Sequence, residues 1–366
     1  MPTEDTQPQA QPLPPLNQIY FYLTEGCNLA CRHCWIAPRF DPTGKDPAAL
    51  PVQLFEQAIV EAKPLGLSGV KLTGGEPLLH PQFDALLEIV ARHEVGLTIE
   101  TNGVLMTPER AAAISRFPNR FVSVSMDGAD AATHEWVRGV AGSFEGAKRG
   151  VRLLVESGTR PQIIFSVMKG NVHHVDAIVG LAEELGAESV KYNLVQPTAR
   201  GEKMHEAAAV LTVPELIELG RHVENGLASS TKLRIFYSHP PAFRPLGKLA
   251  APGGCGRCGI FGIIGVLGNG QYALCGIGET VPDLVFGRVG VDPLATVWAE
   301  NTMLQQIRQG LPAKLEGVCD RCLMKHMCLG ECIAQNYYRS HSLWAPFWFC
   351  EEAEKAGLFP KSRLVA

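Results

Sequence analysis

Cysteine is the residue type whose number and spacing in this sequence point most directly to chemistry. The chain of 366 residues contains 11 cysteines; three are Cys27, Cys31 and Cys34, and the other eight lie between Cys255 and Cys350. Residues 1–16 are rich in proline and glutamine and lack the charged and apolar segments of a secretory signal. We therefore expect a cytoplasmic protein, in which disulfides are rare and cysteines more often hold metals or clusters.

The first group has the spacing Cys27-x3-Cys31-x2-Cys34 and follows a predicted strand at residues 19–24. Three thiolates can hold a [4Fe-4S] cluster and leave one iron open to a substrate or cofactor. A zinc site would need a fourth ligand, for which His33 is available. A zinc knuckle, or a set of reduced surface thiols, is therefore the alternative interpretation of these residues.

This loop resembles that of the radical S-adenosylmethionine (SAM) superfamily. There the three cysteines follow the first strand of a β/α barrel and an aromatic residue comes next, as Trp35 does here. The segment Gly74-Gly75-Glu76-Pro77, after the second predicted strand, is similar to the family element that meets the amino group of SAM. Two glycines let the backbone approach a ligand closely, and Glu76 offers a carboxylate to an ammonium group.

The resemblance also implies SAM contacts at the ends of later predicted strands. Ser125 is the preferred ribose contact, and Asn193 is expected near the adenine. Ordinary turn or strand-end chemistry is the alternative for each residue. The full set of implied SAM contacts is Gly74, Gly75, Glu76, Pro77, Thr101, Asn102, Ser123, Ser125, Asp127, Arg138 and Asn193.

The second group of cysteines is similar in order and spacing to the SPASM domain of peptide-modifying radical SAM enzymes. That resemblance implies two auxiliary [4Fe-4S] clusters. Cys255 could instead be free, which would leave an open iron at the inner cluster, and two structural zinc sites are the alternative. The implied ligands are Cys319, Cys322, Cys328 and Cys350 for an outer cluster, and Cys255, Cys258, Cys275 and Cys332 for an inner one.

The stretch between the two cysteine groups alternates short apolar runs with amphipathic segments. Near-continuous apolar strands that alternate with helices indicate a parallel sheet covered by helices. Six such units predict an α/β fold, a partial (β/α)6 barrel of the TIM type, with functional groups at the carboxyl ends of the strands. The predicted strands are 19–24, 70–73, 97–101, 121–126, 163–168 and 189–194, and the helices are 52–63, 83–93, 108–116, 144–156, 172–185 and 214–227.

The amino-acid composition changes near residue 253, where glycine and cysteine become frequent. We predict a small Cys-rich domain there, stabilised by its metal centres, with helices at 295–309 and 332–340. The aromatic residues before Cys350 are expected to form a hydrophobic contact that packs this domain onto the barrel. The predicted organisation is a flexible arm at 1–18, a radical SAM core at 19–228, a bridging region at 229–252 and a SPASM domain at 253–366.

Composition excludes several classes of protein. The formal net charge is −4, with 33 Lys and Arg against 37 Asp and Glu, so binding to nucleic-acid phosphates is not expected. No apolar run reaches the roughly 18 residues of a membrane span. A monomer is our default expectation.

The resemblance implies an oxidoreductase that reductively cleaves SAM to a 5′-deoxyadenosyl radical and modifies a ribosomally synthesised peptide. Hydrogen abstraction would precede a thioether, carbon–carbon or carbon–oxygen crosslink. The expected cofactors are SAM and three [4Fe-4S] clusters, one at the SAM site and two auxiliary. The expected partners are the precursor peptide and a flavodoxin or ferredoxin as electron donor. Because only about 18 residues precede the first strand, we expect either a separate leader-recognition protein or direct reading of the leader by the barrel and SPASM surface.

Two other enzymes and one binding protein remain as alternatives. They are a radical SAM dehydrogenase or mutase acting on a small molecule, a sulfatase-maturase-like enzyme, and a zinc-stabilised binding module. Sulfatase-maturing relatives carry an aspartate base directly after the position of Cys275, where this chain has Gly276, so formylglycine formation is disfavoured. Glu279 and Asp283 lie near enough in sequence to serve as the base, although nothing singles them out.

Overall fold

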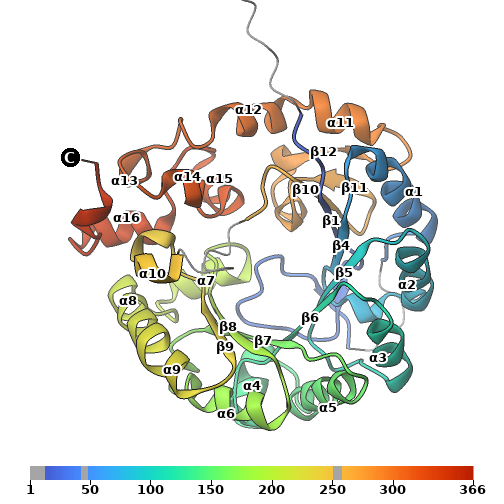
Figure 1. Ribbon diagram of the computed structural model, residues 1–366, viewed down its shortest axis with the longest axis horizontal. Coiled ribbons are helices and arrows are strands. Elements are labelled where there is room, and N and C mark those ends of the chain that lie inside the picture. Colours follow the sequence, from blue (N-terminus) through green and yellow to red (C-terminus); the bar gives the residue numbers. More distant parts are fainter. Residues whose placement is uncertain (1–12, 43–47, 250–257, 366) are drawn as a thin grey trace, which may run out of the picture.

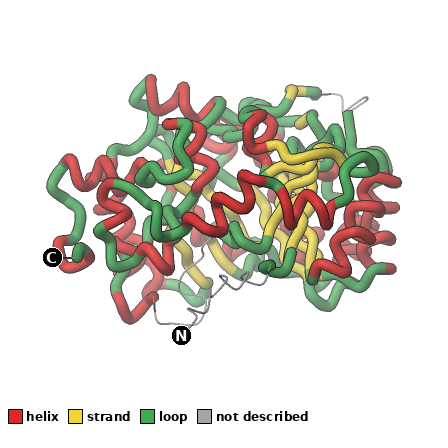
Figure 2. The backbone as a smooth tube through the Cα atoms, turned by 90° about the horizontal axis from the view of Figure 1, so that it is seen from above, coloured by secondary structure: helices red, strands yellow, loops and turns green. Residues whose placement is uncertain are grey.

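The computed structural model describes residues 13–42, 48–249 and 258–365, so Cys255 and most of the predicted arm lie outside the described residues. One large sheet is surrounded by a ring of helices (Figures 1 and 2). Its strands have the order β12-β11-β10-β1-β4-β5-β6-β7-β8-β9. Among the described residues, no helix is both long enough and apolar enough to cross a membrane.

The six predicted strands form the middle of this sheet and are parallel to one another. Their side chains are largely buried, as expected for strands covered on both faces. The α/β partial barrel predicted from the sequence is therefore confirmed. The strands are β1 (Gln18–Tyr22), β4 (Gly69–Thr73), β5 (Gly96–Thr101), β6 (Arg120–Ser125), β7 (Gln162–Val167) and β8 (Ser189–Leu194).

The sheet contains more parallel strands than the six predicted. β9 (Arg234–Tyr237) pairs parallel with β8, and β10 (Ile263–Val266) pairs parallel with β1, which makes eight. β11 (Gln271–Ala273) and β12 (Val285–Arg288) continue beyond β10 as antiparallel strands. The predicted bridging region thus contributes a barrel strand, and the Cys-rich part shares the sheet of the barrel.

The helices on the outer face follow the predicted positions, with additions. Residues 172–185 divide into a 3-10 turn, Val172–His174, and α6 (Ala177–Glu184), while α8 (Val213–Arg221) continues into a π-helical turn, His222–Leu227. The sequence analysis missed α4 (Ala131–Arg138) and α7 (Arg200–Glu206). The other barrel helices are α1 (Val52–Ala62), α2 (Phe83–Arg92), α3 (Pro108–Ser115), α5 (Ser143–Glu156), α6 (Ala177–Glu184), α8 (Val213–Arg221), α9 (Ala228–Ser230) and α10 (Leu246–Leu249).

The C-terminal helices complete the ring between α1 and α8 (Figure 1). The single helix predicted at 295–309 is two, because Asn301 leaves the helical conformation and its side chain caps the second helix at Met303 and Leu304. These helices are α11 (Leu294–Glu300), α12 (Thr302–Gly310), α13 (Gly317–Asp320), α14 (Lys325–Cys328), α15 (Ile333–Ser340) and α16 (Trp348–Lys355).

The largest hydrophobic core among the described residues extends through both parts of the chain. Phe21 of β1 packs on Phe55 of α1 at a ring-centroid distance of 4.3 Å, and Phe349 of α16 packs on Phe243 at 5.0 Å. Trp298 is buried and donates its indole N–H to the carbonyl of Pro14. The C-terminal part is therefore fixed to the barrel by apolar packing as well as by the shared sheet.

Candidate active site

A chamber of about 490 Å³ lies at the carboxyl ends of the parallel strands, where functional sites of such barrels are found. This volume is in the range of sites that enclose small molecules. Both the barrel and the C-terminal part contribute walls. The barrel residues that line it include Tyr20, Tyr22, Lys71, Thr73, Glu100, Ser125, Ser166, Lys191 and Asn193.

The loop with the first three cysteines forms one wall of the chamber. It leaves β1 through the short pair β2 (Gly26–Cys27) and β3 (Arg39–Phe40). Arg200 fastens the loop by donating to the carbonyls of Cys31 and Pro38, at 3.0 and 3.1 Å. Burial raises the pKa of the Cys27 and Cys31 thiols, so thiolates there require a nearby positive charge. Three sulfurs on one loop fit an iron–sulfur cluster, whose irons supply that charge.

The Gly74–Glu76 segment packs directly against the start of this loop. A Cβ on Gly75 would lie 1.9 Å from the carbonyl oxygen of Gly26, and Gly74 has a φ of +123°, so both positions require glycine. The carboxylate of Glu76 points into the protein and accepts three hydrogen bonds. Its donors are the backbone N–H of Leu78 at 3.1 Å, the Thr101 hydroxyl at 2.5 Å and the backbone N–H of Asn102 at 2.8 Å.

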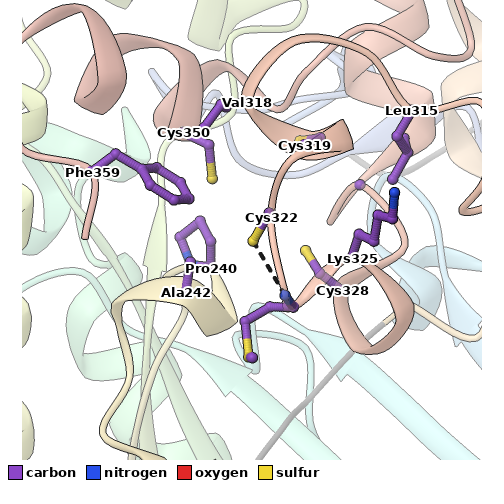
Figure 3. Close-up of a pocket in the computed structure, with 12 residues that line it drawn as sticks. Pro240, Ala242, Leu315, Val318, Cys319, Cys322, Lys325, Cys328, Cys350 and Phe359 are labelled. Carbon is purple, nitrogen blue, oxygen red and sulfur yellow. Dashed lines mark hydrogen bonds between the residues drawn. The ribbon is translucent and has the colours of Figure 1, made fainter. Parts of the chain in front are cut away.

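The C-terminal cysteines occupy two separate places. Cys258, Cys275 and Cys332 line the same chamber as the first three cysteines. The four cysteines assigned to an outer cluster surround a second pocket, formed with Pro240, Ala242 and Phe359 (Figure 3). All ten described cysteines are free thiols.

The described side chains include no group of three or more Cys, His, Asp or Glu that converges on one metal ion. The ligands of a four-iron cluster bind different corners, so they need not converge on a single point. The outer four, Cys319, Cys322, Cys328 and Cys350, come from α13, α14, α16 and the turn between α13 and α14. Two distant stretches of sequence are thus joined at this pocket.

Comparison with known proteins assigns the family. A model of the radical SAM superfamily matches residues 21–185. Mycofactocin maturase MftC of Mycobacterium ulcerans is 30% identical over 350 residues, which cover 93% of this chain and 89% of that protein. The chain belongs to the radical SAM superfamily.

Other known proteins are similar in sequence or fold. An AdoMet-dependent heme synthase of Methanosarcina barkeri is 29% identical over 336 residues, which cover 87% of this chain and 91% of that protein. SuiB of Streptococcus suis bound to precursor peptide SuiA has a TM-score of 0.72 at 18% identity, covering 93% of this chain and 76% of that one. Native anSMEcpe with bound AdoMet has a TM-score of 0.71 at 18% identity, covering 93% and 95%.

Most of the expected SAM contacts of this radical SAM protein lie at the chamber wall. Pro77, Ser123 and Asp127 do not line the chamber, and Asp127 is fully buried. The carboxylate of Glu76 is already used by three donors of the protein. The residues that do line the chamber are Gly74, Gly75, Glu76, Thr101, Asn102, Ser125, Arg138 and Asn193.

The two candidates for a catalytic base lie elsewhere in the radical SAM fold. Glu279 and Asp283 are exposed and neither lines the chamber. Asp283 accepts a hydrogen bond from the Tyr337 hydroxyl at 2.8 Å. Partial desolvation of its carboxyl, together with the charge of Glu25, raises the pKa of Glu279 to about 6. Their closeness to Cys275 in sequence does not bring them to the chamber.

The sequence analysis missed several charged residues that line the chamber, among them Lys71, Glu100 and Lys191. Lys71 and Glu100 form an ion pair at 2.8 Å, and Lys71 lies 4.3 Å from the centre of the Tyr20 ring. Burial would raise the pKa of Glu100, but Lys71 holds it below its usual value. Burial lowers the pKa of Lys191. All three are charged residues inside predicted strands, and a charge at such a position is the signal that could have found them.

Proposed function

We propose that this radical SAM enzyme oxidises a ribosomally made peptide and uses SAM with three [4Fe-4S] clusters. The observation that supports it is that one chamber is lined by thiols of both groups. Cys27, Cys31 and Cys34 lie on one wall, and Cys258, Cys275 and Cys332 also line it. A substrate in this chamber can lose a hydrogen atom on one side and an electron on the other.

The chain's own residues would bind, orient and shield the substrate. When bound, SAM and the first cluster supply a 5′-deoxyadenosyl radical, and auxiliary clusters accept the electron left on the substrate. Trp35, Phe347 and Trp348 line the chamber and exclude water from it. Glu100 and Lys191 are groups in the chamber that can take the proton released on oxidation.

A peptide is the substrate class that the relatives favour. Mycofactocin maturases are among the similar proteins at 27–30% identity, and SuiB shares the fold in complex with its precursor peptide. Four cysteines surround the outer pocket, and a separate set, Cys258, Cys275 and Cys332, lines the chamber and is available to an inner cluster. The two sets together support two auxiliary centres. We further propose a flavodoxin or ferredoxin as electron donor, a monomeric enzyme, and recognition of the leader either by a separate protein or directly by the barrel and SPASM surface.

The test is turnover of a precursor peptide encoded by a short reading frame beside this gene. Anaerobically reconstituted enzyme, SAM and a low-potential reductant should produce 5′-deoxyadenosine together with a peptide that has lost hydrogen, both measured by mass spectrometry. The Cys27→Ala/Cys31→Ala/Cys34→Ala variant should produce neither. Cys275→Ala should still produce 5′-deoxyadenosine but no oxidised peptide, because only the electron acceptor is changed.

A small-molecule substrate is the second candidate, favoured by the AdoMet-dependent heme synthases at 27–29% identity. The same reaction with a carboxylated tetrapyrrole in place of the peptide distinguishes the two. Product formation from the tetrapyrrole, with 5′-deoxyadenosine released in proportion, would replace the peptide proposal.

A further inference from the structure

Arg138, at the end of α4, contacts the sulfur of a proposed cluster ligand. Its Nη1 lies 3.5 Å from Cys31 Sγ, within hydrogen-bonding distance for sulfur. Its Nη2 lies 2.7 Å from Asp127 Oδ2. The guanidinium is buried, its contact with Asp127 is an ion pair, and its Nε has no hydrogen-bond partner among the described residues. One Nη group thus faces the cysteine and the other pairs with the aspartate, while Arg138 also lines the chamber, so its expected contact with SAM stays a prediction.

Asp127 is held rigidly by the surrounding backbone and side chains. Its Oδ1 accepts from the backbone N–H of Ser166 at 2.6 Å, and its backbone carbonyl accepts from Asn171 Nδ2 at 3.0 Å. His33 Nε2 lies 3.7 Å from the second carboxylate oxygen. A carboxylate fixed in this way also fixes the guanidinium that pairs with it.

The end of α4 is fastened to the cysteine loop through its backbone. The N–H of Ala30 donates to the carbonyl of Arg138 at 3.0 Å, and the N–H of Arg32 donates to that of Val137 at 2.9 Å. A Cβ on Gly139 would lie 2.9 Å from the carbonyl oxygen of Ala30, so glycine is needed for this close approach. The distance from Arg138 to Cys31 is thus set by neighbouring backbone on both sides.

We propose that Arg138, oriented by Asp127, raises the reduction potential of the cluster held by Cys27, Cys31 and Cys34. A hydrogen bond from a cation to a thiolate stabilises the more negative, reduced cluster. Arg138 is a positioning and tuning residue in this role. The inference depends on the iron–sulfur part of the proposed function and is independent of the identity of the substrate.

The test is a redox titration of the reconstituted enzyme, followed by electron paramagnetic resonance. The cluster at the first three cysteines is identified as the signal that changes when SAM is added. In Arg138→Gln we expect the ratio of reduced to oxidised cluster, at a fixed potential, to fall about tenfold, because the charge-assisted hydrogen bond that favours the reduced cluster is lost. A tenfold change corresponds to about 59 mV for one electron.

Arg200→Gln is the matched control, because Arg200 also binds Cys31 but through its carbonyl oxygen. We expect that variant to leave the potential unchanged and to lower cluster retention. If Arg138→Gln fails to retain the cluster, Arg138→Lys keeps the cation without the paired Nη donors and should show a smaller fall. An unchanged potential in the Arg138 variants, or an equal shift in Arg200→Gln, would overturn the inference. Absence of the SAM-responsive signal in wild-type enzyme would instead contradict the proposed function.

Discussion

At the scale of single residues, Glu76 has a role in the structure that the sequence motif only partly predicted. The Gly-Gly-Glu-Pro resemblance predicts a SAM contact, and the structure shows a carboxylate that joins the ends of β4 and β5 through two of its three hydrogen bonds. Thr101 and Asn102, its partners, were expected as SAM contacts on their own account. The motif thus positions the wall of the chamber, and the contact of Glu76 with SAM itself stays a prediction.

Replacing Glu76 with glutamine should destabilise the fold by about 2 kcal/mol. The volume is unchanged, but the new amide group would face N–H or O–H donors where an oxygen now accepts. Chemical denaturation measures the change in unfolding free energy. Glu88→Gln, on the exposed face of α2, is the control and should change stability by less than about 0.5 kcal/mol. Equal stability of the two variants would show that the three hydrogen bonds are not required.

Glu279 gives a prediction about pH. Its pKa is raised to about 6, so the folded protein binds this proton more tightly than the unfolded chain does. Its contribution to stability is present below the usual value of 4.5 and is lost as the pH rises through 6. Glu279→Gln should therefore be more stable than wild type at pH 7, by less than about 1 kcal/mol because the side chain is exposed. The two proteins should converge near pH 4.5.

Thermal unfolding at a series of pH values measures this difference. Glu25→Gln should reproduce part of the gain, since Glu25 also raises the pKa of Glu279. Parallel stability profiles for wild type and Glu279→Gln would contradict the prediction. Because Glu279 lies outside the chamber, its replacement should leave 5′-deoxyadenosine formation within about twofold of wild type.

At the scale of elements, close backbone contacts hold the helices on the strands. Gly150 in the middle of α5 lies against the turn after β5, where a Cβ would come within 2.2 Å of the carbonyl oxygen of Gly103. Gly180 in α6 is also a helical glycine, but it has no atom within 4 Å of its Cβ position among the described residues. The same residue type therefore has opposite roles in two helices of the barrel.

Gly150→Ala and Gly180→Ala should change stability in opposite directions. The first forces α5 away from β5 and should cost about 2 kcal/mol or more. The second should stabilise by about 0.5–1 kcal/mol, because alanine is favoured over glycine inside a helix. Thermal unfolding of both proteins measures the signs. A gain of stability in Gly150→Ala would show that α5 moves freely on the sheet.

Element prediction succeeded where the apolar pattern was long and failed where it was short. The six central strands have five or six residues each, with apolar side chains at alternate or successive positions. β9 and β10 have only four residues each, and β10 lies in glycine-rich sequence that favoured an irregular domain. α4 places three polar residues in succession, Thr133 to Glu135, beside few large apolar ones, so its amphipathic pattern was weak.

The sequence also predicted some residues of the site and missed others. The cysteine groups were recognisable because their spacing is local in sequence. Lys71, Glu100 and Lys191 come from three different strands and meet only because those strands belong to one barrel. Contacts such as that between Arg138 and Cys31 join residues far apart in the chain, and no local pattern predicts them.

At the scale of the whole molecule, the barrel and the Cys-rich part share one sheet and one core, and the described cysteines form three sets within it. The first set and Cys258, Cys275 and Cys332 line the chamber, while the outer four surround their own pocket. The cysteines of one set can therefore be replaced without changing those of another set. The iron content of the intact protein and of such variants therefore measures the number of clusters.

Iron and sulfide analysis of anaerobically reconstituted protein should give about 12 iron atoms per chain, corresponding to three [4Fe-4S] clusters. The Cys27→Ala/Cys31→Ala/Cys34→Ala variant should fall to about 8 and lose SAM cleavage. Cys319→Ala/Cys322→Ala/Cys328→Ala should also fall to about 8 but retain SAM cleavage. A content of about 8 iron atoms in wild type would indicate one auxiliary cluster, and zinc without iron would contradict the cluster assignment.

The pairing of β10 with β1 has a consequence for how the protein is made on the ribosome. β1 precedes every other strand of the sheet in the chain, and its partner Ile263–Val266 is synthesised only after residues 23–262. At roughly 5–20 residues per second, that interval lasts on the order of 10–50 s. Throughout it, one side of β1 presents unpaired N–H and C=O groups to any other nascent chain. Translation speed, as well as the stability of the finished fold, should therefore govern the yield of native enzyme.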